Sequence, residues 1–421
     1  MNDRAVRLTV LDPSLERNRW TVGFRLILAI PHFIWLAGWF SLAVLVSIAQ
    51  WIATLIQGTP SPMLHRFLAA YVRYAAHVAA YLTLAADPYP GFTGRPGSYP
   101  VEVEIPEPGQ QNRWVTGFRL VLAIPAVFLA DALLGFGSSA AGGGYGSSGV
   151  AATAGFLGWF YCLAHGRMAE GLRNAAVYGI GYSVQAYGYL FFFTQRYPNS
   201  DPASYEFANV YRADPIRVTV DDDLRRSRLT TFFRVLLAVP HFVWLLLWGI
   251  VALFAALANG VVTVIRGTSP QGLHNFLARY VRYQIHVYAY LQMVANPFPG
   301  FTGREGTYPV DVEIEGPQPQ NRWVTFFRLI LAIPAFLFLG ALATAAFLAA
   351  VFSWFCALFT GRVPRGLRNL GAYDLRYAAQ TYGYVYLLTD RYPYSGPAAG
   401  WQMTLAPEAP PPPAAPWQQA T

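Results

Sequence analysis

One segment of this chain occurs four times, and a repeat of this kind limits the fold more than any other feature of a sequence. Each copy has a Phe-Arg pair and, six residues after the arginine, a proline. The four prolines are Pro31, Pro125, Pro240 and Pro334. Pro240 follows Pro31 by 209 residues, and Pro334 follows Pro125 by the same interval, so the second half of the chain repeats the first. We therefore expect two pseudo-twofold halves, each built from two copies.

The composition places these copies in a membrane. Of the 421 residues, 54% are apolar and 12% are charged, and long apolar runs recur in every quarter. Membrane insertion is the usual cause of such a composition. The sequence runs from Met1 directly into an alternating strand pattern without a cleavable signal peptide, so we expect the N-terminus to stay in the cytoplasm.

The net charge of +8 comes with no lysine, so every basic residue apart from histidine is an arginine. These arginines flank the apolar runs instead of forming a basic patch, which argues against nucleic-acid binding and favours anchors at the membrane surface. Cys162 and Cys356 lie in apolar runs, at positions that are not equivalent in the repeat. We interpret them as buried thiols without a disulfide framework.

Each quarter opens with a short segment in which apolar and polar residues alternate, as in a strand with one buried face. The four segments are 6–10, 101–105, 216–220 and 310–314. Their polar face carries Arg7 and Arg217 in the odd copies but Glu102 and Glu313 in the even copies. Since opposite charges favour pairing across strands, we expect odd strands to pair with even strands in one four-stranded cytoplasmic sheet. The alternative is four separate edge strands.

The apolar run that follows, residues 25–57 in the first quarter, has two interpretations. One is a single helix kinked at Pro31, and the other is a hairpin of two short helices with a turn near residues 38–41. In the second quarter this run is interrupted by the Gly- and Ser-rich segment 135–149 and is 14 residues longer than in the other copies. A polar loop does not face lipid, so this segment favours a turn outside the hydrocarbon. Arginines at both ends of every run agree with a hairpin whose two ends lie on one side.

The hairpin interpretation predicts eight short membrane helices. An even number of crossings in each copy would make all four copies parallel, about an axis along the membrane normal. The predicted fold class is an all-α membrane protein with a small β component. It consists of four tandem repeats of strand, helical hairpin and amphipathic helix, arranged in pseudo-twofold halves.

The last part of each copy is a less apolar helix, expected over 64–86, 172–194, 273–295 and 367–389. Arg73 and His77 are four residues apart and share one helix face, as do Arg282 and His286. A Tyr-x2-His/Gln-x3-Tyr pattern recurs in all four copies and includes Tyr81, Gln185, Tyr290 and Gln380. Such a helix fits the membrane surface, with its basic stripe toward lipid headgroups. The alternative is a helix that crosses the membrane with its polar face turned inward.

Linkers rich in Pro, Gly and Tyr separate the copies and define the expected domains. The first membrane half covers 1–198, with repeats 1–98 and 99–198; a linker covers 199–215; the second membrane half covers 216–394, with repeats 216–307 and 308–394. Residues 395–421 form a Pro- and Ala-rich tail, for which we expect disorder.

Three motifs carry a family resemblance. The unit Phe-Arg-Leu-Ile-Leu-Ala-Ile-Pro, the segment Phe359-Thr-Gly-Arg362 and the segment Thr389-Asp-Arg-Tyr-Pro393 resemble bacterial membrane proteins grouped as domain-of-unknown-function family 4389. The resemblance covers nearly the whole chain apart from the tail, and motif order and spacing recur in every quarter. It implies an integral membrane protein of bacteria, often of actinobacteria, and supplies no activity. The first quarter departs from the pattern, with Gln57-Gly-Thr-Pro-Ser-Pro62 in place of Thr-Gly-Arg362-Val-Pro364.

No enzyme pattern stands out. A phosphate loop that ends in lysine is excluded by the absence of lysine, and there is no Gly-x-Ser-x-Gly nucleophile motif. Six of the seven histidines form three pairs spaced by 209 residues, so they belong to the repeat. His77 and His286 are the best candidates for a shared site, with a structural role as the alternative. Asp131 is the lone acid in an apolar run, which indicates either a transport role or a position near the outer interface. We predict no catalytic residue, cofactor or metal.

The leading hypothesis is a non-enzymatic, multi-pass protein of the cytoplasmic (inner) membrane that engages lipid headgroups, including anionic ones, to organise or shape the membrane or to scaffold partners. The candidate headgroup or cavity residues are Arg25, Arg119, Arg234, Arg328, Arg73, His77, Tyr81, Arg282, His286, Tyr290, Gln185 and Gln380. The N-terminus, strands and tail are expected in the cytoplasm. A second hypothesis is a transporter or channel for a small molecule or lipid, with His77 and His286 facing a central cavity. The protein could also form a homo-oligomer or bind another membrane protein, and the sequence does not decide between these.

Overall fold

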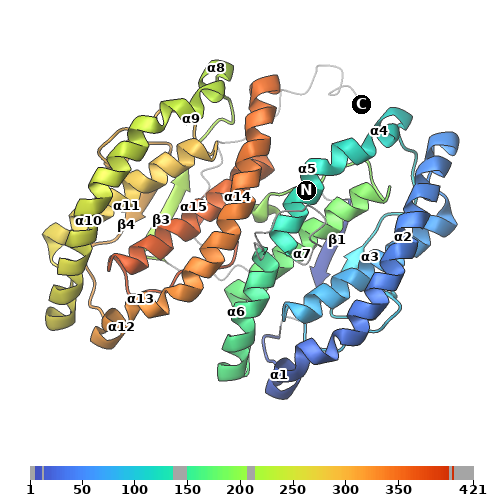
Figure 1. Ribbon diagram of the computed structural model, residues 1–421, viewed down its shortest axis with the longest axis horizontal. Coiled ribbons are helices and arrows are strands. Elements are labelled where there is room, and N and C mark those ends of the chain that lie inside the picture. The colour runs from blue at the N-terminus through green and yellow to red at the C-terminus, as the bar shows by residue number, and fades with distance from the viewer. Residues whose placement is uncertain (1–4, 12–13, 136–148, 206–213, 398–400, 403–421) are drawn as a thin grey trace, which may run out of the picture.

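The computed structural model describes residues 5–11, 14–135, 149–205, 214–397 and 401–402, and most of them are helical (Figure 1). The helices of the first half are α1 Arg19–Leu28, α2 Ile30–Gln57, α3 Pro62–Leu82, α4 Arg113–Gly117, α5 Arg119–Leu134, α6 Val150–His165 and α7 Glu170–Leu190, followed by the short 3-10 helix η2 Pro202–Ser204. Those of the second half are α8 Arg228–Phe232, α9 Arg234–Leu237, α10 Val239–Arg266, α11 Gln271–Leu291, α12 Arg322–Phe326, α13 Arg328–Leu331, α14 Ile333–Thr360 and α15 Arg365–Val385. The strands are β1 Arg7–Val10, β2 Val101–Glu104, β3 Ile216–Val220, β4 Val310–Ile314 and β5 Trp401–Gln402.

The repeated Asn-Arg-Trp motif starts a helix in three copies. The side chains of Asn18, Asn112 and Asn321 each accept a hydrogen bond from the backbone N–H two residues later, which satisfies one of the free donors at a helix start. The repeated proline marks a second helix start. Pro31 lies in the first turn of α2, directly after α1 ends, where its missing N–H costs no hydrogen bond.

The predicted helical hairpins are wrong, because the apolar runs of the first, third and fourth copies each form one long helix. α2, α10 and α14 have 28 residues each and pass through their midpoints without a turn. Polar residues at these midpoints need no loop, since their hydroxyls bond within the helix. Ser41 donates to the carbonyl of Ala37 at 3.1 Å, and Thr344 donates to that of Gly340 at 3.0 Å. The structure therefore has long continuous helices, called rods below, where the sequence predicted eight short ones.

The second quarter keeps this rod although its sequence is interrupted. α5 ends at Leu134, α6 begins at Val150, and a Cβ placed on Gly135 would lie only 2.2 Å from the backbone nitrogen of Gly149. Both α5 and α6 pack on α14 and on α7, as one long helix would. The inserted segment therefore starts and ends at nearly the same point of the rod, and α6 continues the direction of α5 (Figure 1). Residues 136–148, on which the hairpin interpretation depended, lie outside the described part of the chain.

Deleting residues 136–149 is expected to leave the fold and its stability nearly unchanged. The deletion gives the second quarter the length of the other three copies, and the two ends that it joins already touch. The apparent Tm of the purified protein in detergent should stay within a few degrees of the wild-type value, with the same helix content by circular dichroism. Aggregation of the shortened protein would contradict a continuous α5–α6 rod.

The strands pair as their charges predict, but in two sheets. β1 pairs antiparallel with β2, which places Arg7 opposite Glu104, and β3 pairs antiparallel with β4. In the second sheet, Nε of Arg217 lies 3.1 Å from Oε2 of Glu313. The expected single four-stranded sheet does not form, because each pair is packed on the helices of its own half. β5 adds a parallel strand to β3 from within the predicted tail; residues 403–421 lie outside the described part of the chain.

The two copies of each half are antiparallel, which corrects the predicted parallel repeats. The indole of Trp51, near the end of α2, donates to the carbonyl of Thr116 in α4, and the indole of Trp159 in α6 donates to that of Val22 in α1. The start of each copy therefore lies on the end of its partner's long helix. Figure 1 shows α2 running opposite to α5 and α6, and α10 opposite to α14.

The helices form two layers with the sheets on the inner side. The long helices lie outermost, α3, α7, α11 and α15 lie beneath them, and the strands pack on these inner helices. α7 and α15 are buried along nearly their whole length, so they are not the predicted amphipathic surface helices. They lie where the halves meet, and the rings of Tyr178 and Tyr373 touch there, with centroids 6.2 Å apart.

Three described helical stretches are long and apolar enough to cross a membrane. They are Ile30–Gln57, Arg234–Arg266 and Arg328–Thr360. Only 17%, 11% and 44% of their most apolar windows are buried inside the protein, so most of this apolar surface faces outward. These helices indicate a membrane protein.

Candidate functional site

The four arginines of the repeated Phe-Arg pair are buried and bind the protein itself. Arg328 is 2% exposed, and its Nη1 donates to the carbonyls of Tyr384 and Thr389, both at 2.7 Å. Its Nη2 bonds Asp390 at 2.7 Å, and its guanidinium lies 4.4 Å from the centre of the Tyr384 ring. We name this arrangement, in which an arginine closes the C-terminal end of the following inner helix, an arginine clamp. Carbonyls at a helix end lack partners and carry partial negative charge, which a planar guanidinium satisfies well.

The clamp recurs in every copy. Arg25 binds the carbonyls of Tyr81 and Ala86, Arg119 those of Tyr189 and Thr194, and Arg234 those of Tyr290 and Ala295. Tyr81 and Tyr290 lie under the guanidinium groups, at 4.3 Å in both cases. The clamp arginines therefore do not reach lipid headgroups, which corrects the predicted role of Arg25, Arg119, Arg234 and Arg328.

The Arg/His stripes of α3 and α11 face the strands. Nε of Arg73 donates to the carbonyl of Val103 in β2 at 3.0 Å, and Nε of Arg282 donates to that of Val312 in β4 at 2.8 Å. The His77 ring packs on Tyr99, and Nε2 of His286 lies 3.5 Å from Asp311. These stripes pin each sheet to its inner helix. They do not line a central cavity, so the transporter hypothesis loses its main support.

The two predicted glutamines also hold the fold together. Oε1 of Gln185 accepts from the backbone of Asn199 at 3.1 Å, and Oε1 of Gln380 accepts from that of Tyr394 at 3.2 Å. Both contacts fix the segment that follows an inner helix. Asp131 is exposed on the last turn of α5, next to the point where the insertion leaves the rod.

Acid is expected to weaken the fold through His77. Burial first, and then the charge of Arg73, lower the pKa of His77 to about 4, although Glu102 opposes this shift. Between pH 6.5 and about 4 the unfolded chain binds a proton that the folded protein excludes, so stability falls as the pH falls through this window. Thermal unfolding at pH 7.5 and at pH 4.5 should show a smaller acid effect in His77→Gln than in wild type. An equal effect would mean that other groups dominate.

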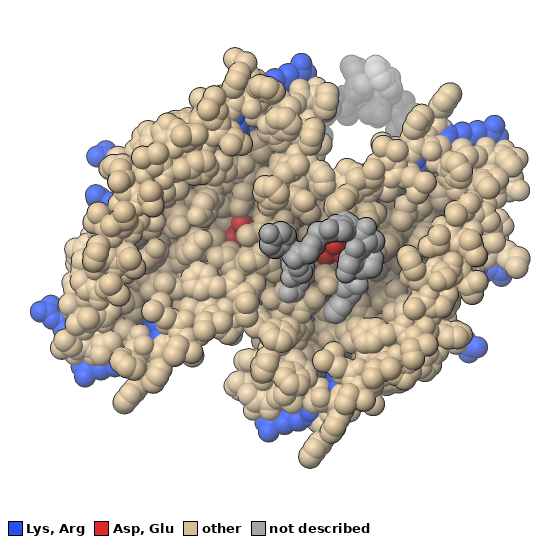
Figure 2. Space-filling view, in the orientation of Figure 1, with Lys and Arg blue, Asp and Glu red and all other residues tan. Residues whose placement is uncertain are grey.

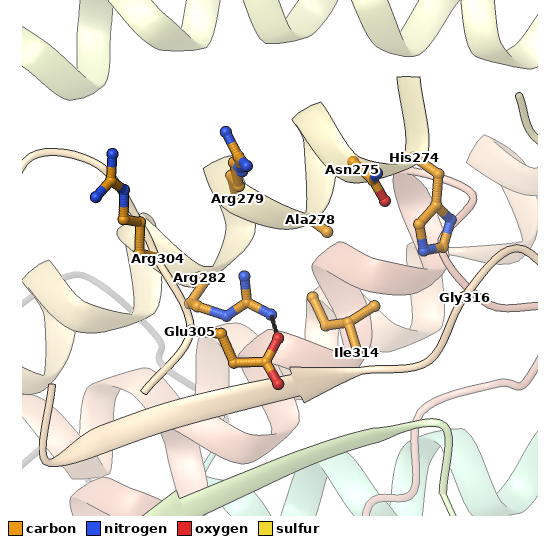
Figure 3. A pocket seen from close by; sticks show the side chains of 9 residues that line it. All are labelled: His274, Asn275, Ala278, Arg279, Arg282, Arg304, Glu305, Ile314 and Gly316. Carbon is orange, nitrogen blue, oxygen red and sulfur yellow. Dashed lines mark hydrogen bonds and ion pairs between the residues drawn. The ribbon is translucent and has the colours of Figure 1, made fainter. Parts of the chain in front are cut away.

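A basic pocket lies on the polar side of α11 (Figure 3). Its volume is about 350 Å³, and its lining residues are His274, Asn275, Ala278, Arg279, Arg282, Arg304, Glu305, Ile314 and Gly316. Nη2 of Arg282 forms an ion pair with Glu305 at 3.0 Å. The guanidinium groups of Arg279 and Arg304 have no hydrogen-bond or ion-pair partner among the described residues, and both side chains are exposed. The pocket therefore carries an excess of positive charge and fits an acidic group.

The pocket and the long helix lie on different faces of α11. Phe276 and Tyr280 contact Trp248 of α10. At 3.6 residues per turn, Asn275 and Arg282 point away from these contacts, and Arg279 lies between the two faces. The pocket therefore lies at the edge of the face that packs on α10.

The sequence predicted no pocket here, because the prediction relied on recurring features, and Arg304 recurs as Arg95 without an arginine at the position of Arg279. The signal that identifies the pocket is a difference between the halves, since Arg279 corresponds to Ala70 and Glu305 to Pro96. Within the described ranges, no group of three or more His, Cys, Asp or Glu side chains is arranged to hold a metal ion.

Comparison with known proteins gives one family. The model of a family described as a domain of unknown function (DUF4389) matches residues 19–93, 228–302 and 322–395, which together are more than half of the chain. The second quarter lies outside these matches, although its helices follow the same order. No curated protein and no solved structure matches the chain.

Proposed function

The protein belongs to the DUF4389 family, and we propose that it is a non-enzymatic membrane protein whose long-helix layer lies within one leaflet, parallel to the membrane. In this position it engages acidic lipid headgroups and organises or bends the bilayer. One observation carries the proposal: the outer face of the long helices is apolar and almost free of charge, while the opposite side of the molecule is polar.

The apolar face is broad. Leu45 on α2, Leu247 on α10 and Phe347 on α14 are 63%, 52% and 64% exposed. On the long rods and the short helices before them, the exposed charges are Arg19, Arg113, Arg228, Arg322 and Arg266 at helix ends, and Asp131. Figure 2 displays this face with its basic residues around the rim and only small acidic areas near the middle. A surface of this size needs a hydrocarbon environment.

The strands favour helices that lie in the membrane plane over helices that cross it. Arg73 and Arg282 lie near the middle of α3 and α11, and both bind strand carbonyls, so the sheets cover the middle of these helices. Arg7 and Glu104 are exposed on that side. If the rods crossed the bilayer, these charges would lie at the depth of the hydrocarbon, where exposed charges are costly. If the rods lie in one leaflet, the same charges face water.

The basic pocket then supplies a headgroup contact. Of its exposed arginines, Arg279 lies beside the face of α11 that packs on α10, and Arg304 lies on the linker that follows α11. Arginine side chains next to a membrane surface attract anionic lipids. An apolar layer that enters one leaflet also increases the area of that leaflet alone, which bends the membrane.

Reconstitution tests the membrane-shaping role. Large liposomes that contain anionic lipid should become smaller or tubular as protein loading rises, measured by electron cryo-microscopy. Leu45→Lys and Leu247→Lys, which place charges on the apolar face, should weaken this effect, whereas Arg95→Lys should not. Unchanged liposomes at high protein loading would contradict the proposal.

The double variant Arg279→Ala/Arg304→Ala tests the headgroup contact. It should reduce the enrichment of anionic lipid around the purified protein, measured by lipid mass spectrometry. Arg95→Ala is the matched control, because Arg95 occupies the position of Arg304 in the first half, where Ala70 replaces Arg279. Equal enrichment of anionic lipid in both variants would mean that the pocket does not bind lipid headgroups.

A further inference from the structure

A buried polar cluster lies between α11 and α15 in the second half. Asp374 of α15 is 3% exposed, and its Oδ2 accepts a hydrogen bond from Nε2 of Gln292 at 2.7 Å. Its other oxygen, Oδ1, has no partner among the described residues. A buried carboxylate oxygen without a partner is costly, which calls for a donor that the protein itself does not supply.

Two more acceptors are also unsatisfied, one on the glutamine that bonds this carboxylate and one about two turns earlier on α11. Oε1 of Gln292 and Oε1 of Gln284 are buried without a hydrogen-bond partner in the described structure. A single proton on Asp374 could not satisfy both glutamine oxygens, because a protonated carboxyl donates once and Gln284 lies about two turns from Gln292. A group with several N–H donors and a positive charge would match this arrangement.

Tyrosines line the same two helices beyond this carboxylate. Nε2 of Gln284 donates to the hydroxyl of Tyr288 at 3.4 Å, and burial and then the neighbouring Tyr288 and Asp374 raise the pKa of Tyr382. Tyr280 and Tyr386 touch, with ring centroids 5.8 Å apart. Of these rings, Tyr382 is within electrostatic range of Asp374, and an aromatic ring together with a carboxylate is a typical environment for a bound organic cation.

The first half has no such cluster. The positions of Gln284, Tyr288, Gln292, Asp374 and Tyr386 correspond to Ala75, Ala79, Thr83, Gly179 and Phe191. Five polar side chains therefore replace apolar or small ones in one half only. The shared fold does not require them, because the first half forms the same helices without them.

The cluster is reached from the apolar face. Gln284, Tyr288 and Tyr386 are partly exposed, and Figure 2 shows this face hollowed between α10 and α14, above α11 and α15. The walls of the hollow are long apolar helices, and its floor carries the polar residues. An amphiphile would fit with its polar end on the floor and its chain between the walls.

We propose that the hollow between α10 and α14 binds a primary ammonium group through Asp374 and Gln292, with an attached hydrocarbon chain lying between the two helices. The ammonium group donates to the free Oδ1 and Oε1 atoms. Its source is either a free alkylamine or the headgroup of an aminolipid. Burial, opposed by the hydrogen bond from Gln292, raises the pKa of Asp374 to about 7, so binding should strengthen between pH 6 and pH 8 as the carboxylate ionises.

Native mass spectrometry of the full chain in detergent tests the site with three probes. Dodecylamine and phosphatidylethanolamine carry a primary ammonium group, and dodecyltrimethylammonium carries the same charge without N–H donors. We expect one dodecylamine bound per chain, with affinity at least about tenfold higher than that of the trimethyl probe. Retention of phosphatidylethanolamine as well would identify a lipid source, and retention of dodecylamine alone would identify a soluble source. Equal binding of the trimethyl probe, or no binding of either amine, would overturn the proposal.

Variants assign the binding to these residues. Asp374→Asn keeps the shape of the side chain but removes its charge, and it should lower dodecylamine affinity at least about tenfold. Asp131→Asn is the control, because it removes the other acid of the apolar face. If Asp374→Asn does not fold, Gln292→Thr, which introduces the residue of the first half, should cause a similar loss. Unchanged affinity in the folded variants would overturn the site. Because all measurements are made in detergent, this test does not depend on how the helices lie in the membrane.

Discussion

Replacing Arg328 by methionine is expected to destabilise the protein by about 3–5 kcal/mol. Methionine keeps much of the packing against Tyr384 but supplies no donors, so the carbonyls of Tyr384 and Thr389 and the carboxylate of Asp390 lose their partner together. The apparent Tm in detergent should fall by at least about 5 °C.

Arg322→Met is the matched control for this clamp variant. Arg322 lies six residues earlier in the same copy and is exposed at the first position of α12, so its loss should change stability by less than about 0.5 kcal/mol. If Arg328→Met unfolds at the wild-type temperature, the clamp does not stabilise the helix end, and a lipid-facing role for Arg328 would have to be considered again.

The second large effect is expected for Gly303→Ala. Gly303 has a φ of +55°, and a Cβ at this position would lie 2.1 Å from the carbonyl oxygen of Arg279. Both the left-handed conformation and the contact exclude a side chain unless the linker moves away from α11. We expect a loss of more than about 2 kcal/mol, measured by thermal unfolding in detergent.

Gly300→Ala provides the comparison in the same linker. A Cβ on Gly300 would meet no atom within 4 Å, and its φ is not in the left-handed region, so the variant should unfold like wild type. Gly94 repeats the geometry of Gly303 in the first half, with a Cβ 2.1 Å from the carbonyl oxygen of Ala70. Gly94→Ala should therefore behave like Gly303→Ala. Similar Tm values for the Gly300 and Gly303 variants would show that the linker adapts.

Local patterns predicted the parts of the fold that depend on nearby residues. The alternation of Arg7 and Thr9 with apolar residues, and the acids of the even copies, predicted which strands pair. The family match agrees with the predicted family over three segments of the chain. These features follow from side-chain periodicity and backbone chemistry, which the sequence states directly.

The hairpins could not be predicted correctly, because the interruption at 135–149 has two physical solutions. A polar insertion either ends a membrane helix or leaves it as a side loop while the helix continues. The choice depends on contacts made by distant helices, here the packing of α5 and α6 on α14. Ser41 and Thr344 did not help to distinguish a turn from a continuous helix, since a hydroxyl within a helix can bond to a backbone carbonyl one turn earlier.

The predicted headgroup residues were placed wrongly for a similar reason. An arginine before an apolar run has the appearance of a membrane anchor. Arg25 instead binds the end of α3, 56 residues later, through the carbonyl of Tyr81. That partner is a backbone atom, which no residue pattern reveals. The pocket at Arg279 and the buried carboxylate of Asp374 were missed because each depends on a difference between the halves.

Labelling the two ends of α2 tests the membrane account most directly. Single cysteines at Glu16, just before α1, and at Gln57, the last residue of α2, are introduced after Cys162→Ala and Cys356→Ala remove the native thiols. Sealed vesicles of one orientation are then treated with a membrane-impermeant maleimide. Helices that lie in one leaflet place both cysteines on the same side, so we predict that both are labelled, or both protected, together. Labelling of one cysteine before the vesicles are opened and of the other only afterwards would mean that α2 crosses the bilayer, and would contradict the account.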